Sequence, residues 1–238
     1  TFEDIAPKYD FLNRVLSLGI DIYWRKKAIK LTNFKDGNKV LDVACGTGDF
    51  SILAKFKHNL DIYGADFSLN MLRLYNKKKS YTLGKLVQTQ SEHLPFVDST
   101  FDNIIVAFGV RNFYDIPKAF DEFKRVLKSG GKVTILEFSL PKNKLIGSLY
   151  KFYFKKVLPL IGGIVSGNFS AYKYLPDSVE EFDEKINLVE LLNNAKFSKV
   201  IRTTLSFGIV QCVIAEKQLF RYNTLLFLFF CIILFNID

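Results

Sequence analysis

Cysteine is scarce in this sequence, and the cysteines that are present lie far apart. They are Cys45, Cys212 and Cys231, with no Cys-X-X-Cys pair among them and no histidine beside them. Neither a disulfide framework nor a zinc site is therefore indicated. A reducing compartment fits this cysteine usage best, and we predict no metal site.

Linkers rich in Ser, Gly or Pro are also missing, so nothing divides the chain into separate domains. At 238 residues it is long enough for one domain with a sizeable core. We predict a helical cap over 1–38, a single domain over 39–217 and an apolar tail over 218–238. The first residues, from Thr1, contain no apolar signal-peptide core, and a removed targeting segment stays an open alternative.

The tail carries an uninterrupted apolar run from Leu225 to Phe235. As a helix this run would cover about 17 Å, against about 30 Å for the hydrocarbon core of a bilayer. A full membrane span is therefore not expected. Three alternatives stay open: a shallow membrane anchor, a segment that packs on the domain, and a read-through or frame-shifted gene end.

Positive charge exceeds negative charge, with 33 Lys and Arg against 24 Asp and Glu. The excess is spread over short clusters such as 25–27, 77–79 and 155–156. Solvated helix faces and contact with an anionic membrane surface both explain it. Signatures of zinc fingers, RRM domains or helix-turn-helix motifs are missing, so we expect no nucleic-acid partner.

Hydrophobic spacing predicts two helices over residues 4–32, separated near Gly19, and then strands that alternate with helices. The caps expected for later helices are Ser68 and Asp115, with Gly130 and Gly131 ending the helix that Asp115 begins. The predicted strands are 40–44, 61–66, 85–90, 102–108, 132–138, 198–205 and 208–216, and the predicted helices are 51–56, 68–77, 116–128 and 187–195.

This alternation predicts an α/β fold, a mostly parallel sheet flanked by helices. The last two strands are expected to close the sheet as an antiparallel hairpin that turns near Phe207 and Gly208. Residues 143–182 are predicted to be an irregular insertion that covers the substrate.

The first candidate site is the turn after the first strand, from Asp42 to Asp49. Gly46 and Gly48 let the backbone approach a ligand closely, and the helix start beyond them offers free N–H groups. An ordinary tight turn gives the same pattern, so that alternative stays open. Asp42, Gly46, Thr47 and Gly48 are our candidates here for binding a cofactor.

The second strand ends at Asp66, where a carboxylate can accept both hydroxyls of a ribose. The turn lacks the third glycine of the dinucleotide motif, because Phe50 and Ser51 stand there. A nucleoside without phosphates is therefore favoured, and S-adenosylmethionine is the common ligand of that kind. An NAD-linked oxidoreductase is the weaker alternative.

Two further loops follow strands, and open sheets bind ligands at the carboxyl ends of their strands. Gln90 and Ser91 follow the third strand and are expected to border an adenine. Arg111 and Asn112 follow the fourth strand and are expected to face the reacting methyl and its acceptor. A structural salt bridge for Arg111 and a turn or helix cap for Asn112 are the alternatives.

Several segments, in order over residues 2–217, resemble the ubiquinone/menaquinone biosynthesis C-methyltransferases. FGVRNF and AYKYLP are the most diagnostic of them. The segments are FEDIAPKYDFLN at 2–13, WRKKA at 24–28, GTGD at 46–49, LPF at 94–96, FGVRNF at 108–113, RVLK at 125–128, LEFS at 136–139 and AYKYLP at 171–176.

The resemblance implies a class I S-adenosylmethionine-dependent methyltransferase with a Rossmann-like fold. It implies cofactor contacts at Thr47, at Asp66, at the Gln90-Ser91 pair and at Ala107, where family members often have serine. Ala107 offers only its backbone for that contact. Many members also carry a histidine or tyrosine where this chain has Val213, so no role is carried over to that side chain.

The implied reaction is C-methylation of a quinol ring, in demethylmenaquinol or in the ubiquinone precursor. Arg111 and Asn112 are the expected catalytic residues, acting through water or by stabilising a phenolate. The isoprenoid tail of the substrate needs apolar cover, for which the N-terminal helices and residues 149–165 are candidates. Ordinary core packing explains the same residues.

The expected location is cytoplasmic and peripheral to the inner membrane, or on the matrix side in a mitochondrion. Two other functions stay open. One is a methyltransferase for another small molecule such as a sterol, a phenol or a phospholipid amine. The other is a membrane-associated module without catalysis. The sequence does not indicate the oligomeric state.

Overall fold

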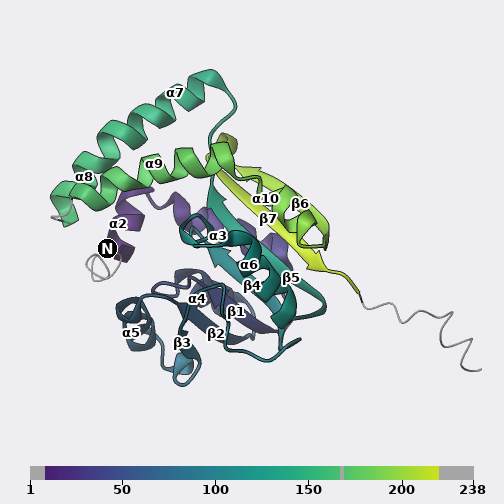
Figure 1. Ribbon diagram of the computed structural model, residues 1–238. Coiled ribbons are helices and arrows are strands. Elements are labelled where there is room, and N and C mark those ends of the chain that lie inside the picture. The colour runs from purple at the N-terminus through teal and green to yellow at the C-terminus, as the bar shows by residue number, and fades with distance from the viewer. Residues whose placement is uncertain (1–8, 167–168, 220–238) are drawn as a thin grey trace, which may run out of the picture.

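A computed structural model of the chain describes residues 9–166 and 169–219 (Figure 1). The α-helices are α2 (Tyr9–Leu16), α3 (Ile20–Thr32), α4 (Asp49–Lys57), α5 (Leu69–Lys78), α6 (Ile116–Val126), α7 (Lys144–Phe152), α8 (Leu158–Ser166), α9 (Phe169–Lys185) and α10 (Leu188–Asn194). The strands are β1 (Lys39–Val43), β2 (Asp61–Asp66), β3 (Leu86–Gln88), β4 (Phe101–Ala107), β5 (Leu127–Phe138), β6 (Phe197–Leu205) and β7 (Val210–Lys217). Short turns of 3-10 helix are η2 (Ser80–Thr82), η3 (Val110–Asn112) and η5 (Ser206–Gly208), and η4 (Tyr153–Val157) is a π-helical turn.

The strands form one sheet in the order β3-β2-β1-β4-β5-β7-β6. β1 to β5 pair in parallel, whereas β7 is antiparallel to both β5 and β6. This confirms the predicted α/β fold with a closing antiparallel hairpin. The chain leaves β3 on one side of β1 and returns as β4 on the other, so the strand order reverses there, which is where open sheets of this type bind ligands.

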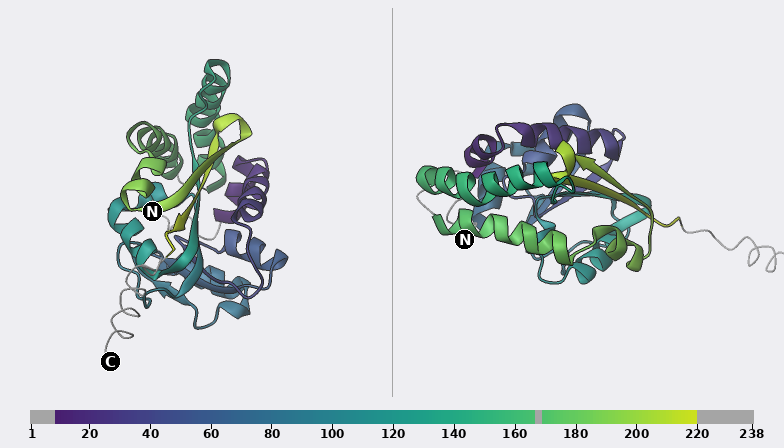
Figure 2. Two further views of the ribbon diagram at one scale, coloured as in Figure 1. Left: turned by 90° about the vertical axis from the view of Figure 1, so that its right-hand side faces the viewer. Right: turned by 90° about the horizontal axis from the view of Figure 1, so that it is seen from above.

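Helices cover both faces of the sheet (Figures 1 and 2). On one face α3 and α4 pack through an apolar cluster that includes Trp24 and Phe50, and on the other α6 and α10 pack through one that includes Phe120 and Leu192. Consecutive residues of a strand point to opposite faces, and Ile104 and Ile105 of β4 accordingly belong to different clusters. The central strands are therefore anchored on both sides.

The helix starts follow the predicted caps. Gly19, at a φ of 76°, separates α2 from α3, and the Ser68 hydroxyl accepts a hydrogen bond from the Met71 N–H at 3.2 Å. The Asp115 carboxylate caps α6 by accepting from the Lys118 N–H at 3.0 Å. The start of the first predicted helix, residues 4–8, lies outside the described residues.

Gly130 and Gly131 do not end α6, which corrects the sequence prediction. The helix ends at Val126, and the chain passes at once into β5, where Leu127 pairs with Phe101. Gly131 is needed there for packing, because a Cβ atom would lie 2.9 Å from the Lys128 carbonyl oxygen and 3.0 Å from that of Asp102. The two glycines therefore lie within β5, near its start.

The segment predicted to be irregular, residues 143–182, is largely helical. It forms α7, η4, α8 and most of α9, with Pro159 in the first turn of α8 and Pro176 inside α9. These helices pack with α2 through a separate apolar cluster that includes Leu12, Leu16 and Tyr150. The helices of the insertion and α2 thus pack together beside the sheet, whereas α3 lies on one of its faces (Figure 1).

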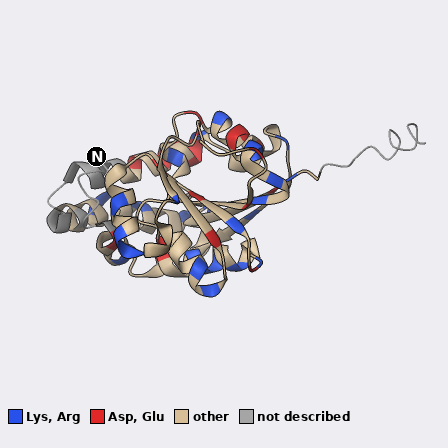
Figure 3. Cartoon of the chain, turned by 90° about the horizontal axis from the view of Figure 1, so that it is seen from below, with Lys and Arg blue, Asp and Glu red and all other residues tan. Residues whose placement is uncertain are grey.

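Lys and Arg are spread over many elements and are interspersed with Asp and Glu (Figure 3). Within the described residues, no helix combines the length and the apolar character that a membrane span requires. The same residues contain no cluster of three or more His, Cys, Asp or Glu side chains placed to hold a metal ion. Cys45 and Cys212 are buried free thiols, and Cys231 lies outside the described residues.

Candidate active site

A cavity of about 560 Å³ opens at the carboxyl ends of β1, β2 and β4, at the reversal of strand order. Pockets that hold small ligands usually measure about 300–1,000 Å³. Its walls come from four loops, each of which follows one of the parallel strands. The lining residues are Val43, Ala44, Gly46, Ala65, Asp66, Phe67, Ser68, Met71, Thr89, Gln90, Ser91, Glu92, Ala107, Phe108, Gly109, Asn112, Phe113 and Tyr114.

The loops after β1 and β4 meet at the cavity with unusual backbone conformations. Ala44 and Phe108 both have positive φ, at 51° and 58°, a region that residues other than glycine seldom adopt. Gly109 lies against Ala44, and a Cβ atom at Gly109 would come within 2.6 Å of the Ala44 Cβ. Strain of this kind is common at ligand sites, and here it brings two loops close together.

Asp66 joins the second strand to the glycine turn. Its carboxylate accepts the Gly46 N–H at 2.7 Å and the Ser68 N–H at 2.8 Å. These contacts fix the carboxylate on the cavity wall, facing the turn after β1. The sequence predicted that the end of β2 and the glycine turn both bind the cofactor, and in the structure they are joined by a hydrogen bond.

Gln90, Ser91 and Glu92 form the wall after β3. Glu92 accepts hydrogen bonds from the Ser91 hydroxyl at 2.9 Å and from the Asp115 N–H at 2.9 Å. Burial alone would raise the pKa of Glu92, but these hydrogen bonds outweigh it and lower the pKa below its usual value. Glu92 is therefore ionised near neutral pH and ties this wall to the start of α6.

The structure brings six of the ten predicted site residues together on the cavity wall. Asn112 is among them, and it is not a helix cap, since Asp115 caps α6 instead. The six are Gly46, Asp66, Gln90, Ser91, Ala107 and Asn112.

Asp42, Thr47 and Gly48 lie behind the cavity wall. The Thr47 hydroxyl donates a hydrogen bond to Asp10 of α2, so it ties the helical cap to the glycine turn. Gly48, at a φ of 82°, packs against the Tyr75 ring, which leaves no room for a Cβ atom. These residues therefore stabilise the conformation of the turn after β1 and do not line the cavity.

Asp42 is fully buried beneath the turn, and its Oδ2 has no hydrogen-bond partner within the described residues. Burial raises the pKa of Asp42 from 3.8 to about 7, although hydrogen bonds from Ser51 oppose the shift. This carboxyl can therefore change charge near neutral pH.

Arg111 also lies off the cavity, in the arrangement that the sequence left open as an alternative. Its guanidinium forms a buried ion pair with Glu137 of β5, with 2.8 Å between Nη1 and Oε1. The same Nη1 donates to the Phe108 carbonyl at 2.6 Å. Arg111 therefore clamps the loop after β4, the loop that carries Phe108 and Asn112.

The sequence analysis included Tyr150 of α7 only in the apolar segment 149–165 and missed its hydroxyl, which interacts electrostatically with Arg111 and Glu137 of this clamp. An aromatic series leads toward it: Phe108 contacts Phe138 at 4.5 Å between ring centroids, Phe138 contacts Phe154 at 5.7 Å, and Phe154 stacks on Tyr150 at 4.6 Å. The Tyr150 hydroxyl is buried without a hydrogen-bond partner among the described residues. No motif could reveal this position, because it depends on how α7 folds over β5.

The cavity suits a nucleoside better than a dinucleotide. Asp66 supplies a fixed carboxylate for ribose hydroxyls, and Gly46 has no side chain to block approach to its backbone. Apart from carboxylates, the wall is mainly apolar and aromatic, with Phe67, Met71 and Phe113 among its residues. Within the lining set there is no Lys or Arg for a pyrophosphate.

Comparison with known proteins gives a consistent result. The model of the ubiE/COQ5 methyltransferase family matches residues 1–217. The ubiquinone/menaquinone biosynthesis C-methyltransferase UbiE of Geobacter sulfurreducens is 43% identical over 92% of this chain and 87% of its own length. The demethylmenaquinone methyltransferase of Thermus thermophilus is 40% identical over 91% of this chain and 99% of its own length.

Among solved structures, a SAM-dependent methyltransferase from Aquifex aeolicus has a similar fold. Its TM-score is 0.55 at 21% sequence identity, and the match covers 81% of this chain and 88% of that protein. At this identity the likeness shows the fold alone. It confirms the Rossmann-like methyltransferase architecture.

Proposed function

The chain belongs to the ubiE/COQ5 methyltransferase family, and from that premise we propose that it methylates a ring carbon of an isoprenoid quinol with S-adenosylmethionine. The acceptor is demethylmenaquinol or the corresponding ubiquinone precursor. Relatives at 40–43% identity carry the names of these two activities. The enzyme is a methyltransferase, and its residues would serve this reaction by binding the cofactor and by aligning the acceptor ring.

The hydrogen bond from the Gly46 N–H to the Asp66 carboxylate supports this proposal most directly. It links the ribose-binding position to the glycine turn at one wall of a cavity of suitable volume. We propose that Asp66 holds the ribose, that Gln90 and Ser91 border the adenine, and that Gly46 and the Ala107 backbone line the remainder. Bound there, S-adenosylmethionine supplies a methyl group already activated on a sulfonium.

On the acceptor side, the residues must align a ring carbon and stabilise charge on a ring oxygen. Asn112 lies on the cavity wall and can offer its amide to that oxygen. Arg111 acts as a positioning residue, because its guanidinium holds the loop through Phe108 and Glu137. The acceptor ring gives up one proton in exchange for the methyl group.

Tyr150 is our second candidate for contact with the ring oxygen. Burial raises the pKa of its hydroxyl above the usual range for tyrosine, so the hydroxyl stays protonated and can donate. Arg111 Nε is likewise buried without a partner within the described residues. Buried polar atoms normally have partners, so two such atoms near one another favour a polar ligand group between α7 and the loop after β4.

Replacing Asp66 with Ala tests the cofactor site. We expect S-adenosylmethionine affinity to fall at least about tenfold, since a hydrogen bond to a charged group contributes roughly 1.5–3 kcal/mol. Titration calorimetry measures this directly. Asp61→Ala, at the other end of β2, is the matched control and should leave the affinity unchanged. Unchanged affinity in Asp66→Ala would refute the assigned role.

The acceptor is tested with a demethylated naphthoquinol and a demethylated benzoquinol, each carrying one short isoprenoid unit. Transfer of a labelled methyl group to a ring carbon supports the proposal and shows which ring is preferred. Transfer only to a sterol, a phenol oxygen or a phospholipid amine would overturn it. Since such acceptors are membrane lipids in the cell, we also propose that the enzyme works in the cytoplasm at the inner membrane, or on its matrix side in a mitochondrion.

A further inference from the structure

The outer surface of α7 exposes a row of large apolar side chains. Leu145, Leu149 and Phe152 are 72%, 63% and 63% exposed. Steps of four and three residues place them on one face of the helix. Exposed apolar rows of this length are unusual unless another surface covers them.

The core does not account for this row, because α7 already packs through its opposite face. Tyr150 of α7, and Phe154 and Leu158 beyond it, follow one another at steps of four and are buried against α2 and α9. With 3.6 residues per turn, these positions point away from Leu145, Leu149 and Phe152. The helix is thus apolar on two opposite sides, one packed and one open.

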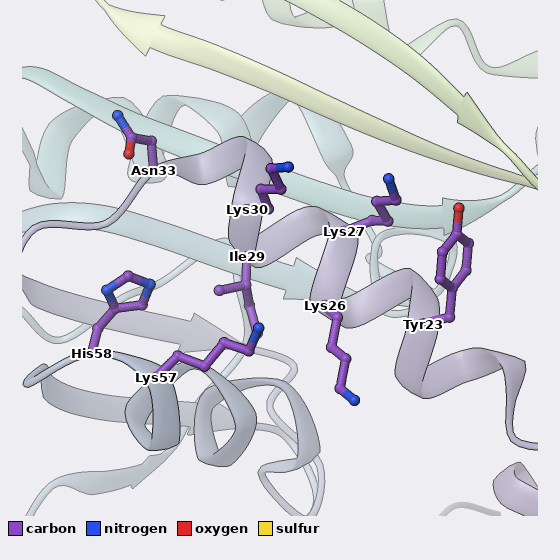
Figure 4. A pocket seen from close by; sticks show the side chains of 8 residues that line it. All are labelled: Tyr23, Lys26, Lys27, Ile29, Lys30, Asn33, Lys57 and His58. Carbon is purple, nitrogen blue, oxygen red and sulfur yellow. The ribbon is translucent and has the colours of Figure 1, made fainter.

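A second feature lies on the outer face of α3. A cavity of about 600 Å³ lies between α3 and the end of α4. Figure 4 shows Lys57 reaching toward α3 there. The residues around it are mostly basic. They are Tyr23, Lys26, Lys27, Ile29, Lys30, Asn33, Lys57 and His58.

The positive charge of this cavity is uncompensated. The lining contains four lysines and no carboxylate. Within the described part of the chain, none of the four ammonium groups has an ion pair or a side-chain hydrogen bond, although those of Lys85 and Lys151 do, and Lys27 lies over the Tyr23 ring at 5.8 Å. Lysines that border a hollow from several sides attract phosphate-bearing groups.

The two features adjoin through the bend between α2 and α3. The Tyr153 hydroxyl, just after α7, donates to the Leu16 carbonyl at 2.6 Å. Beyond Leu16, the exposed side chains of Leu18 and Ile20 lead into Tyr23 and the lysines of α3. The two features are therefore linked through the end of α2 and the bend at Gly19.

We propose that this surface, the α7 row with the lysine hollow of α3, docks the protein on an anionic lipid bilayer. Apolar side chains enter the acyl boundary while lysines contact phosphate headgroups, which is the usual division of labour in interfacial binding. The inference rests on the proposed function, because an isoprenoid acceptor resides in a bilayer. It also explains why the row lies on the outer side of the helix that buries Tyr150.

Vesicle binding of the full-length chain tests the apolar row. The double variant L149E/F152E should bind vesicles of phosphatidylcholine and phosphatidylglycerol at least about tenfold more weakly than the unaltered chain, because it loses two apolar contacts. Leu83→Glu, at another side chain that is 76% exposed, is the control and should bind normally. Equal vesicle binding by L149E/F152E and the unaltered chain would overturn the proposal, because another segment would then be responsible for binding.

Charge reversal tests the lysine hollow. K26E/K30E should lose about tenfold or more in affinity for the same vesicles, since each lysine near an anionic surface contributes about 1 kcal/mol. The matched control K77E/K79E makes the same change in net charge at the end of α5 and should have a much smaller effect. An equal loss in both variants would mean that net charge alone matters and would refute a defined hollow.

Activity separates this inference from the proposed function. L149E/F152E and K26E/K30E should lose about tenfold more of their turnover rate with a long-chain quinol in vesicles than with a short-chain quinol in solution. An equal loss with both acceptors would place the effect in the substrate site and overturn the docking surface. If the unaltered chain methylates neither quinol, the proposed function fails, while the binding comparison still decides the docking surface.

Discussion

Asp42 and Asp66 lie at neighbouring strands of the same sheet, yet their surroundings give the two carboxyls different tasks. Asp66 is held on the cavity wall by two backbone N–H groups, whereas Asp42 is sealed beneath the glycine turn. A buried carboxyl without full hydrogen bonding is costly to ionise. We therefore expect Asp42 to affect the stability of the fold and not to contact the ligand directly.

Replacing Asp42 with Asn should reveal a pH-dependent cost. Because the pKa is raised to about 7 in the folded protein, the folded state keeps a proton that the unfolded chain releases from about pH 4 upward. Stability therefore falls as pH rises through this window and is level above about pH 7. The free energy of unfolding of Asp42→Asn should therefore rise relative to that of the unaltered chain over the same window, by at most about 1.4 kcal/mol per pH unit.

Thermal unfolding of both proteins at several pH values measures this difference. Asp121→Asn, at an exposed site on α6, controls for loss of a carboxylate in general. A constant difference between Asp42→Asn and the unaltered chain across the window would show that Asp42 is ionised throughout.

Variants of the Arg111–Glu137 pair test whether it supports the loop after β4 or takes part in the reaction itself. Glu137→Gln should destabilise the fold by roughly 3 kcal/mol, because it leaves a buried guanidinium without its counter-charge. Replacing both partners, as R111M/E137L, should recover much of that stability, but turnover should stay low. Full stability in Glu137→Gln, or full turnover in the double variant, would contradict the clamp.

At the scale of single residues, the sequence predicted which kinds of contact form the site better than which residues make them. Asp66 and Gly46 were predictable, since a carboxylate and a glycine at successive strand ends must meet in a parallel sheet. Thr47 and Arg111 were harder, because their side chains turn toward Asp10 and Glu137. Those partners come from elements whose placement no local pattern reveals.

At the scale of elements, α2 is fastened to the glycine turn by polar contacts. Asp10 accepts from Thr47 and pairs with Lys78 of α5, and Arg14 pairs with Asp49 at 2.8 Å. This group of contacts, which we term the α2 latch, joins the helical cap to the cofactor side of the sheet. Its members are partly exposed, so each contact is individually weak.

A double-mutant cycle between Asp10→Ala and Lys78→Ala should give a coupling on the order of 0.5 kcal/mol. Hydrogen exchange over 9–16 should become faster in either variant, while exchange in β1 and β4 stays slow. Lys77→Ala is the control on the same helix. Unchanged exchange in α2 would mean that its apolar contacts alone hold it in place.

The helices over 143–182 show where prediction from sequence failed. This segment was predicted to be irregular, yet proline is tolerated in the first turn of a helix, as at Pro159 of α8. Pro176 lies inside α9, whose packing on α8 offsets a lost backbone hydrogen bond. By contrast, most strands follow local patterns of burial and were predicted to within two residues at each end, except β5, which begins at Leu127 rather than at residue 132.

At the scale of the whole molecule, the sheet is complete at Lys217, the last residue of β7. We therefore expect a chain that ends after Leu219 to fold and bind cofactor like the full chain, with a change in stability below about 1 kcal/mol, or roughly 2–4 °C in melting temperature. Leu219 is kept because it packs beside Gly130. A larger loss would show that residues 220–238 contribute to the domain.

The reversed direction of β7 has a practical consequence. β7 pairs antiparallel with β5, so Lys217 lies beside the start of β5, whereas the cavity proposed to bind the cofactor lies where the parallel strands end. A biotin or affinity tag joined after this strand would tether the enzyme to a sensor chip with its ligand entrance turned toward the flowing sample.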